Sequence, residues 1–320
     1  MRKILLVILT LTLASCTPRA GRAEAQPTEA GQSVVPTIAS PLNTITSSPT
    51  ANVAVPTVPT PIDPNTIPAS FFAMNTVNPD DYPKLTFGTL SHPEVGAWAW
   101  VEKTKGVYDF SLFDHYVSDA VAHGLEDSTN TVNVAITLGE TPPWATSDPS
   151  SCKPRHDNTF CSSGPANIQD WADFVKAMLS HYNGVTEPHV RYYELWNEVD
   201  NPPFYSGTIP ELVNLAKTAY PSVHADSHSM FLTPSVTLSS GGSGNDNSPA
   251  WMAKYLDAGG TRYADGGAFH EYIAGGGVKP YPMPEQDFTS GCVEYKGCWG
   301  SVITWANAMR QVFDQHGLAG

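Results

Sequence analysis

The chain has 320 residues, with 31 acidic side chains against 17 basic ones, a formal net charge of −14 and an isoelectric point near 5.0. This balance argues against a nucleic-acid-binding protein, which needs a basic face to neutralise phosphates, so we expect no nucleic-acid partner. No Phe, Trp or Tyr precedes Phe71, and the remaining chain is long enough for one sizeable core.

Residues 1–16 have the pattern of an export signal. Arg2 and Lys3 precede an apolar run from Ile4 to Leu13 that is too short to span a bilayer as a mature helix. The run ends in Leu-Ala-Ser-Cys at 13–16, which resembles the lipobox of bacterial lipoproteins. We expect an exported cell-surface lipoprotein that contacts the membrane only through a lipid on Cys16. An ordinary signal peptide with an incidental cysteine is the alternative.

Residues 17–68 are rich in Thr, Pro, Ser and Ala, with ten prolines and almost no charge. Such a composition cannot bury enough apolar surface to fold. We therefore expect a disordered Thr/Pro-rich linker that holds the following domain away from its anchor.

From residue 69 onward, short apolar segments alternate with amphipathic ones. The apolar segments predict strands at 71–77, 85–90, 132–138, 192–196, 230–236 and 267–273. The amphipathic segments predict helices at 111–123, 168–182, 211–225, 251–257 and 302–316, with helix starts at Thr208 and Ser248. Strands that alternate with helices indicate an α/β fold with a parallel sheet.

Six predicted strands and a last helix bring the chain to Gly320. A closed (β/α)₈ TIM barrel needs two more strands, so we expect residues 69–320 to form an incomplete barrel of about six of the eight βα units. An open doubly wound sheet is the alternative, but no glycine-rich phosphate loop follows the first strand.

Four cysteines follow Cys16, in two sequence-local pairs. In an exported protein they are most simply two loop-closing disulfides, Cys152 with Cys161 and Cys292 with Cys298. A structural zinc site is the competing interpretation, but neither pair has C-x-x-C spacing. We expect no metal and no cofactor.

The segment Arg191–Glu198 predicts a buried strand that ends by presenting Asn197 and Glu198 side by side. This motif and three others resemble clan A glycoside hydrolases, most closely family 39, the family of β-xylosidases and iduronidases. The matching segments are Tyr-Glu-Leu-Trp-Asn-Glu at 193–198, Gly-Val-Tyr-Asp-Phe at 106–110, Thr-Leu-Gly-Glu-Thr-Pro-Pro-Trp-Ala at 137–145 and Phe-His-Glu-Tyr at 269–272.

The resemblance implies retaining hydrolysis of O-glycosidic bonds in poly- or oligosaccharides, with Glu198 as general acid/base and Asn197 as donor to a sugar hydroxyl. It also places His270 and Tyr272 in the substrate pocket, and period-2 alternation puts these two on one face of their strand. A core histidine and tyrosine with satisfied hydrogen bonds are the alternative. β-Xylosides, other plant-wall glycosides and uronic-acid glycosides are all compatible with the resemblance.

Further candidates lie at predicted strand ends. Trp98 and Trp144 could stack on sugar rings or pack in the core, and Glu140 is a weaker candidate for substrate contact. Glu271 should point away from the His270 face.

The chain departs from the family pattern in two places. Near the second strand, where the family has an Arg, it has Gly-Thr-Leu-Ser-His at 88–92. The family's nucleophile glutamate ends the seventh strand, which we expect beyond Gly320. The chain would then be a fragment that is inactive or poorly folded alone. A surface lipoprotein that binds carbohydrate without catalysis is the alternative function.

Overall fold

A computed structural model describes residues 73–75, 87–91, 96–155, 158–237, 248–270 and 302–318. The expectations for Cys16, the 17–68 linker, Tyr272, Cys292 and Cys298 lie outside these residues. The chain divides into two compact units, and every described residue belongs to the unit that excludes residues 12–61. No helix in the described ranges combines the length and apolar character needed to cross a membrane.

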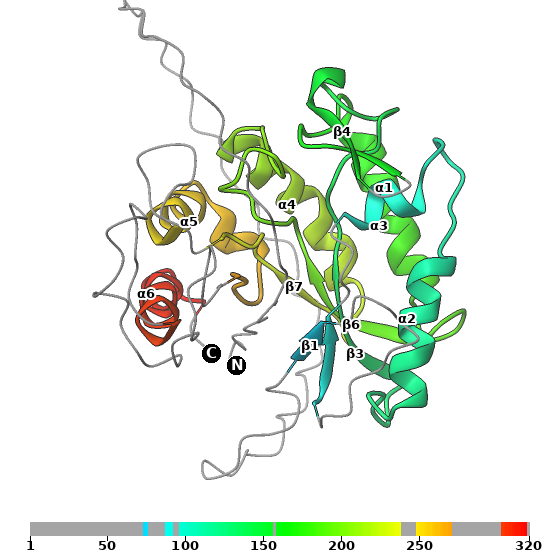
Figure 1. The fold of residues 1–320 in the computed structure, drawn as a ribbon. Helices are drawn as coiled ribbons and strands as arrows, with labels where there is room; N and C mark the ends of the chain where they lie inside the picture. The colour runs from blue at the N-terminus through cyan, green and yellow to red at the C-terminus, as the bar shows by residue number, and fades with distance from the viewer. Residues whose placement is uncertain are drawn as a thin grey trace, which may run out of the picture. The chain divides into compact units, whose positions relative to one another are not determined.

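Five parallel strands form the main sheet, which confirms the expected α/β class (Figure 1). They are β1 (Ala73–Asn75), β2 (Thr89–Ser91), β3 (Thr131–Thr137), β6 (His189–Glu194) and β7 (Met230–Leu232), in the spatial order β1-β2-β3-β6-β7. Parallel bridges from Leu232 to Gly266 and from Thr237 to His270 add the next segment beside β7. This segment is where the sequence predicts a sixth strand.

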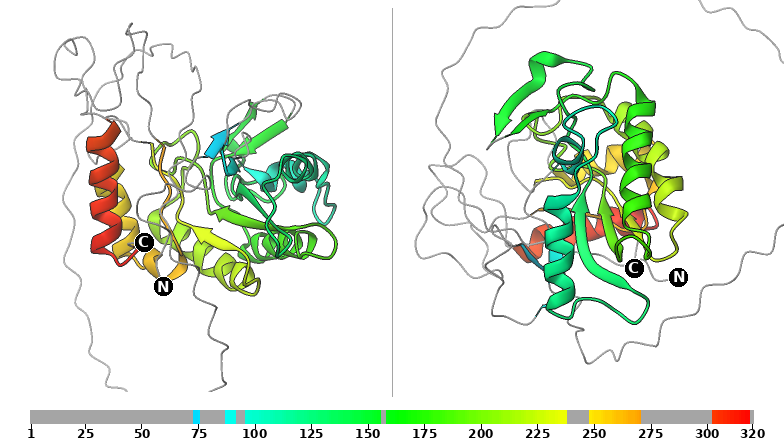
Figure 2. Two further views of the ribbon diagram at one scale, coloured as in Figure 1. Left: turned by 90° about the horizontal axis from the view of Figure 1, so that it is seen from below. Right: turned by 90° about the vertical axis from the view of Figure 1, so that its right-hand side faces the viewer.

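Five helices lie where the sequence predicts them. They are α2 (Ser111–Ala122), α3 (Ile168–His181), α4 (Ile209–His224), α5 (Ser248–Asp257) and α6 (Val302–Gln315). Thr208 and Glu211 form the predicted capping box of α4, in which each side chain bonds to the other residue's backbone N–H. In the ribbon views α3 lies beside α4, and α5 beside α6 (Figures 1 and 2).

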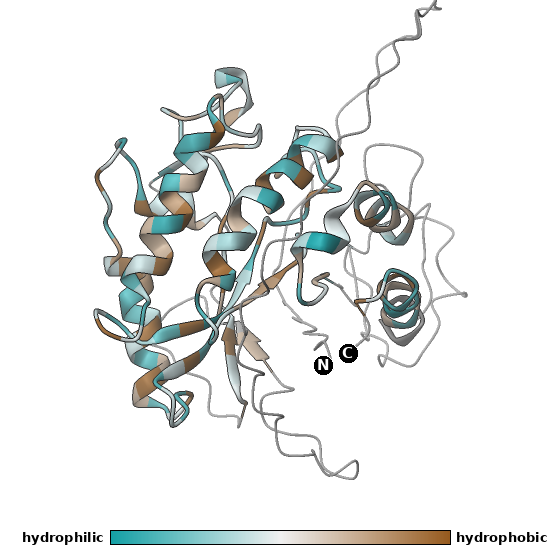
Figure 3. Cartoon of the chain, turned by 180° about the vertical axis from the view of Figure 1, so that it is seen from behind, coloured by the Kyte–Doolittle hydropathy of each residue, from teal (hydrophilic) through white to brown (hydrophobic). Residues whose placement is uncertain are grey.

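The core lies between the helices and one face of the sheet. Val132, Val134, Ile136 and Leu138 alternate along β3 and its end toward the helices, as period-2 geometry requires. Each of the helices α2 to α6 contributes buried side chains to this one cluster. Accordingly, α3 and α4 show alternating apolar and polar stretches in Figure 3.

The opposite face of the sheet carries a second, smaller cluster. It contains Ala135, Tyr192, Leu232 and Ala268, with Met230 packed against them. Right-handed crossovers that always advance in one direction give a sequential strand order and put all helices on one face. A doubly wound sheet reverses its order and is covered by helices on both faces. The described sheet therefore does not fit the doubly wound alternative.

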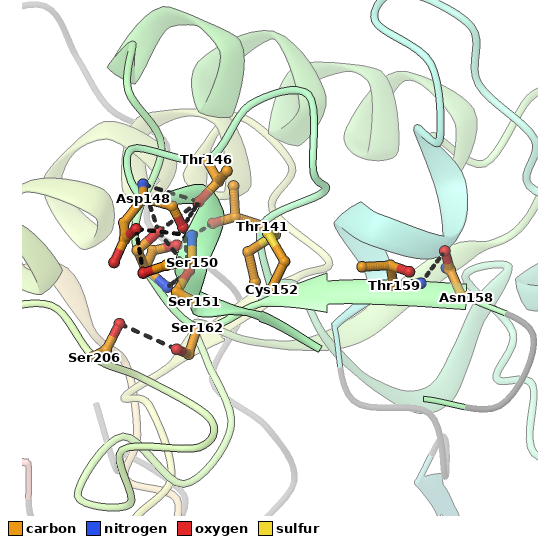
Figure 4. The surroundings of a disulfide bond; sticks show 12 residues. Thr141, Thr146, Asp148, Ser150, Ser151, Cys152, Asn158, Thr159, Ser162 and Ser206 are labelled. Carbon is orange, nitrogen blue, oxygen red and sulfur yellow. Dashed lines mark hydrogen bonds between the residues drawn. A yellow bond between two sulfur atoms is a disulfide. The ribbon is translucent and has the colours of Figure 1, made fainter. Parts of the chain in front are cut away.

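A short helix and a hairpin that the sequence did not predict lie between strands of the sheet. Helix α1 (Ala97–Val101) has only five residues, too few for a clear amphipathic period. A hairpin of β4 (Cys152–Arg155) and β5 (Asn158–Cys161) lies between β3 and α3. The disulfide between Cys152 and Cys161, with an S–S distance of 2.01 Å, closes this hairpin and confirms the predicted pair (Figure 4). The zinc alternative is wrong for these two cysteines.

Candidate active site

The segment after β6 presents Asn197 and Glu198 at the carboxyl end of the strand. Tyr193 and Leu195 belong to the core beneath the helices, whereas Tyr192 lies in the cluster on the opposite face. Trp196 packs so closely over Gly139 that a Cβ at position 139 would overlap its ring. Its indole N–H donates to the carbonyl of Phe204 at 2.9 Å. These contacts fix the backbone just before Asn197.

Glu198 is a buried carboxylate on an unusual backbone. Its side chain is only 8% exposed, and its φ of 43° lies in the left-handed region. Its backbone N–H donates to Ser235 Oγ at 3.0 Å, and its carbonyl accepts from Asn201 N–H at 2.9 Å. His270 Nδ1 lies 3.0 Å from Oε1 of Glu198. The structure thus brings together Glu198 and His270, which are 72 residues apart in sequence.

His270 is buried between acidic groups. Burial by itself lowers the pKa of an imidazole, but the hydrogen bond to Glu198 and the charges of Glu194, Glu198 and Asp200 outweigh burial and raise the pKa of His270. The result favours a protonated ring beside Glu198.

Glu194 is a buried acid that the sequence analysis did not select. Its Oε2 accepts from Thr137 Oγ1 at 2.8 Å and its Oε1 from Ser235 N–H at 3.0 Å. Burial raises its pKa, and the nearby His270 and the hydrogen bonds only partly offset that effect. Ser235 therefore contacts both residues: its N–H donates to the Glu194 carboxylate, and its Oγ accepts from the backbone N–H of Glu198. The sequence did hold a signal for Glu194: it is a charged residue, two positions after Tyr192, in a strand expected to be buried.

Asn197 has an unsatisfied polar atom next to Glu198. The residue is 2% exposed, and its Oδ1 has no hydrogen-bond partner among the described residues. Buried polar atoms are normally paired, so such an atom calls for an explanation.

Asp200 lies two residues beyond Glu198 and is also buried. It accepts from Ser248 Oγ at 2.6 Å and from the Thr237 N–H at 2.8 Å. Burial raises its pKa, and the charge of Glu198 contributes in the same direction. Through these bonds Asp200 links the end of β6 to the start of α5.

The structure corrects the expectation for Trp98. Its ring is fully buried, stacks on Phe174 at 5.6 Å between centroids and donates from Nε1 to Glu102 at 2.7 Å. It therefore has no exposed face for a sugar ring, and its role is core packing. Trp144 is half-buried and donates to the Glu102 carbonyl at 2.7 Å. Its role in substrate binding stays a prediction.

Glu140 is a buried acid that is paired with a cation. It is 2% exposed and forms an ion pair with Arg155 of the β4–β5 hairpin, whose guanidinium lies 4.1 Å from the Phe160 ring centroid. Glu140 is therefore not a solvated loop acid, and its contact with substrate stays a prediction.

No family model matches the sequence. No curated protein matches it either. Among solved structures, a glucosidase from Croceicoccus marinus is similar at 14% identity and a TM-score of 0.44, covering 78% of this chain and 44% of its own. A family 39 β-xylosidase from Caulobacter crescentus is 18% identical with a TM-score of 0.42, covering 57% and 39%. A family 39 glycoside hydrolase from Bacteroides cellulosilyticus is 24% identical with a TM-score of 0.39, covering 59% and 34%.

These structural neighbours are glycoside hydrolases, and two belong to the family that the sequence motifs resemble. The chain spans less than half the length of each.

Proposed function

We propose that this protein hydrolyses O-glycosidic bonds in oligo- or polysaccharides, with Glu198 as the general acid/base. The observation that carries the proposal is the Asn197–Glu198 pair at the end of β6. It combines a buried carboxylate, bonded to His270, with a buried amide oxygen that lacks a partner in the described part of the chain.

The Glu198–His270 pair supports acid/base chemistry because a carboxyl group and an imidazole are both groups that take up and give protons in catalysis. Oε1 and Nδ1 are 3.0 Å apart, within hydrogen-bond reach. With Glu198 ionised, Nδ1–H donates to the carboxylate and stabilises it as a base. When Glu198 carries a proton, its carboxyl group can donate that proton to the oxygen of a leaving sugar.

Asn197 would supply substrate positioning. Its amide can accept from and donate to a sugar hydroxyl, and its Oδ1 has no competing partner among the described residues. A hydrogen bond to the hydroxyl beside the reacting carbon strengthens as positive charge develops on the ring in the transition state.

We further propose a (β/α)₈ barrel and a retaining double displacement. The sequential strand order and the one-sided helices support the barrel. Retention requires a second carboxylate roughly 5 Å from the first. Glu194 and Asp200 are the described acids next to this network, but hydrogen bonds engage both oxygens of each, so we assign neither as the nucleophile.

Carbohydrate binding without turnover is the second candidate function. The engagement of Glu194 and Asp200 in hydrogen bonds favours it, because neither presents a free oxygen beside Glu198 in the described part of the chain.

The test is turnover of a panel of aryl glycosides, including β-xylosides, by the full chain. Glu198→Gln should lower kcat/KM by about 10²–10⁴-fold, the usual contribution of a general acid/base. Glu126→Gln, at an exposed position, is the matched control and should leave turnover unchanged.

Calorimetry with xylo-oligosaccharides separates the two functions. If the native chain shows no turnover and the Glu198→Gln variant still binds the oligosaccharides, the second candidate is supported. If the chain shows neither binding nor turnover with any member of the panel, both candidate functions are contradicted.

A further inference from the structure

The segment that follows β7 continues the sheet beside the end of β6. The register pairs Glu194 with Leu232, and three residues further on the same register places Ser235 opposite Asn197. Ser235 is fully buried, and its N–H donates to the Trp196 carbonyl at 2.9 Å, the bond that a parallel ladder requires at this position. The two backbones therefore remain paired up to the residue before Asn197.

The ladder is interrupted at Glu198. In a regular parallel ladder the Ser235 carbonyl would accept from the N–H of Glu198, the residue after Asn197. It accepts instead from the Val199 N–H at 3.0 Å, so the β6 side contains one extra residue. Glu198, whose φ is 43°, is that residue. One extra residue in one of two paired strands is a β-bulge, which turns a side chain in a new direction and is frequent beside active sites. The bulge thus determines where the Glu198 carboxylate points.

A bulge removes the ladder partners of the extra residue, and substitutes replace them here. The N–H of Glu198 donates to Ser235 Oγ at 3.0 Å. Its carbonyl, which a regular ladder would bond to the Thr237 N–H, accepts from the Asn201 N–H at 2.9 Å. The Thr237 N–H donates to the Asp200 carboxylate at 2.8 Å. The Ser235 hydroxyl is therefore the acceptor that allows a buried N–H of Glu198 to leave the ladder.

The same short segment also holds His270. The His270 N–H donates to the carbonyl of Val236, the residue after Ser235, at 2.9 Å. His270 Nδ1 lies 3.0 Å from Oε1 of Glu198. One stretch of backbone thus positions both members of the pair, and a shift of Glu198 relative to Ser235 changes the distance between the carboxylate and the imidazole.

We propose that Ser235 is the positioning residue of Glu198, whose hydroxyl stabilises the bulge and so holds the carboxylate against His270. The inference rests on the proposed function, because Glu198 is the proposed general acid/base. Alanine at position 235 leaves the buried N–H of Glu198 without its acceptor, which favours a return of Glu198 toward the regular ladder. A shift of a catalytic group by about 1 Å can lower the rate about 10²-fold.

The first experiment compares crystal structures of the native chain and of Ser235→Ala. In the variant, φ of Glu198 should leave the left-handed region, and the distance from Oε1 to His270 Nδ1 should exceed about 3.5 Å, beyond hydrogen-bond range. Ser229→Ala is the matched control, because Ser229 is a buried serine that donates to the Val190 carbonyl of β6 at 2.7 Å. It should leave Glu198 in place. An unmoved Glu198 in Ser235→Ala overturns the proposal, whether or not the chain is an enzyme.

The second experiment is turnover of aryl glycosides with poor and with good leaving groups. Ser235→Ala should lower kcat/KM about 10–100-fold for poor leaving groups, which need a proton from Glu198. The loss should be smaller for dinitrophenyl glycosides, whose leaving group departs without protonation. Ser229→Ala should retain the native rates with both.

Three kinetic outcomes would overturn the role of Ser235 in a chain whose turnover depends on Glu198. They are native rates in Ser235→Ala, an equal loss with both kinds of leaving group, and an equal loss in the two serine variants. Failure of the proposed function is seen separately, as a native chain without turnover or with turnover that Glu198→Gln does not change. The crystal structures then decide the proposal for Ser235.

Discussion

The backbone at Glu198 has a φ of 43°, a conformation that costs a non-glycine residue about 1–3 kcal/mol when the surroundings do not support it. Ser235 Oγ accepts its N–H, and Asn201 N–H donates to its carbonyl, so both backbone groups are satisfied in this conformation. Strained residues of this kind concentrate at functional sites. The observation agrees with the role proposed for Glu198.

At the same scale, Glu194→Gln tests the buried acid behind the site. Glutamine keeps an acceptor for the Ser235 N–H and an amide for Thr137, so we expect a small change in the free energy of unfolding at about pH 4.5. Glu194→Ala instead removes the acceptor of the buried Thr137 hydroxyl, at about 1–3 kcal/mol, whereas the Ser235 N–H keeps the Trp196 carbonyl at 2.9 Å as an acceptor. Urea denaturation of both variants measures the difference.

The pH dependence of Glu194→Gln has a defined sign. Burial raises the pKa of Glu194 above its usual 4.5, so the folded chain binds this proton more tightly than the unfolded chain does. The stability contributed by Glu194 is thus full below about pH 4.5 and falls as pH rises through the folded value. The native chain should lose stability relative to Glu194→Gln between pH 4.5 and 7. A difference that stays constant over this range contradicts the assignment.

At the scale of elements, the ends of β3 and β6 meet where Gly139 faces Trp196. The Gly139 N–H donates to the Leu195 carbonyl at 3.1 Å, so the two backbones are joined at this point. The missing side chain at 139 lets the Trp196 indole lie flat against the backbone. This contact fixes the direction in which the chain leaves β6 toward Asn197.

Gly139→Ala should therefore destabilise the protein by at least about 1–3 kcal/mol, the usual cost of overpacking, because neither the backbone nor a buried indole can move far. Melting temperature and urea midpoint measure the loss. Gly164→Ala is the matched control, since a Cβ there meets nothing within 4 Å. Equal stability of the two variants would show that the β3–β6 contact is looser than described.

At the scale of the whole molecule, the expected lipid anchor belongs to the first 16 residues, which lie outside the described ranges. We propose that Cys16 is lipidated after export. In a bacterial host the native chain should incorporate labelled palmitate and sediment with membranes. Cys16→Ala should do neither. Labelling that persists in Cys16→Ala contradicts lipidation at this position.

The sequence by itself determined the alternation of elements and several of their boundaries. Apolar periodicity and caps are local, so α2, α3, α4 and the β6 region follow from short segments, and the capping box at Thr208 is readable from two residues. The Cys152–Cys161 disulfide followed from sequence proximity. The position of Glu198 at a strand end was equally local.

Only the tertiary structure decided which side chains meet. The alternation along β6 was visible, but not that Glu194 would reach Ser235, or that His270 would lie against Glu198. Trp98 illustrates the same limit: the sequence places it near a strand end, where a tryptophan can face either solvent or the core, whereas in the structure it lies in α1 and packs against Phe174. Such contacts join residues far apart in sequence, and local patterns carry no information about which distant side chain occupies the facing position.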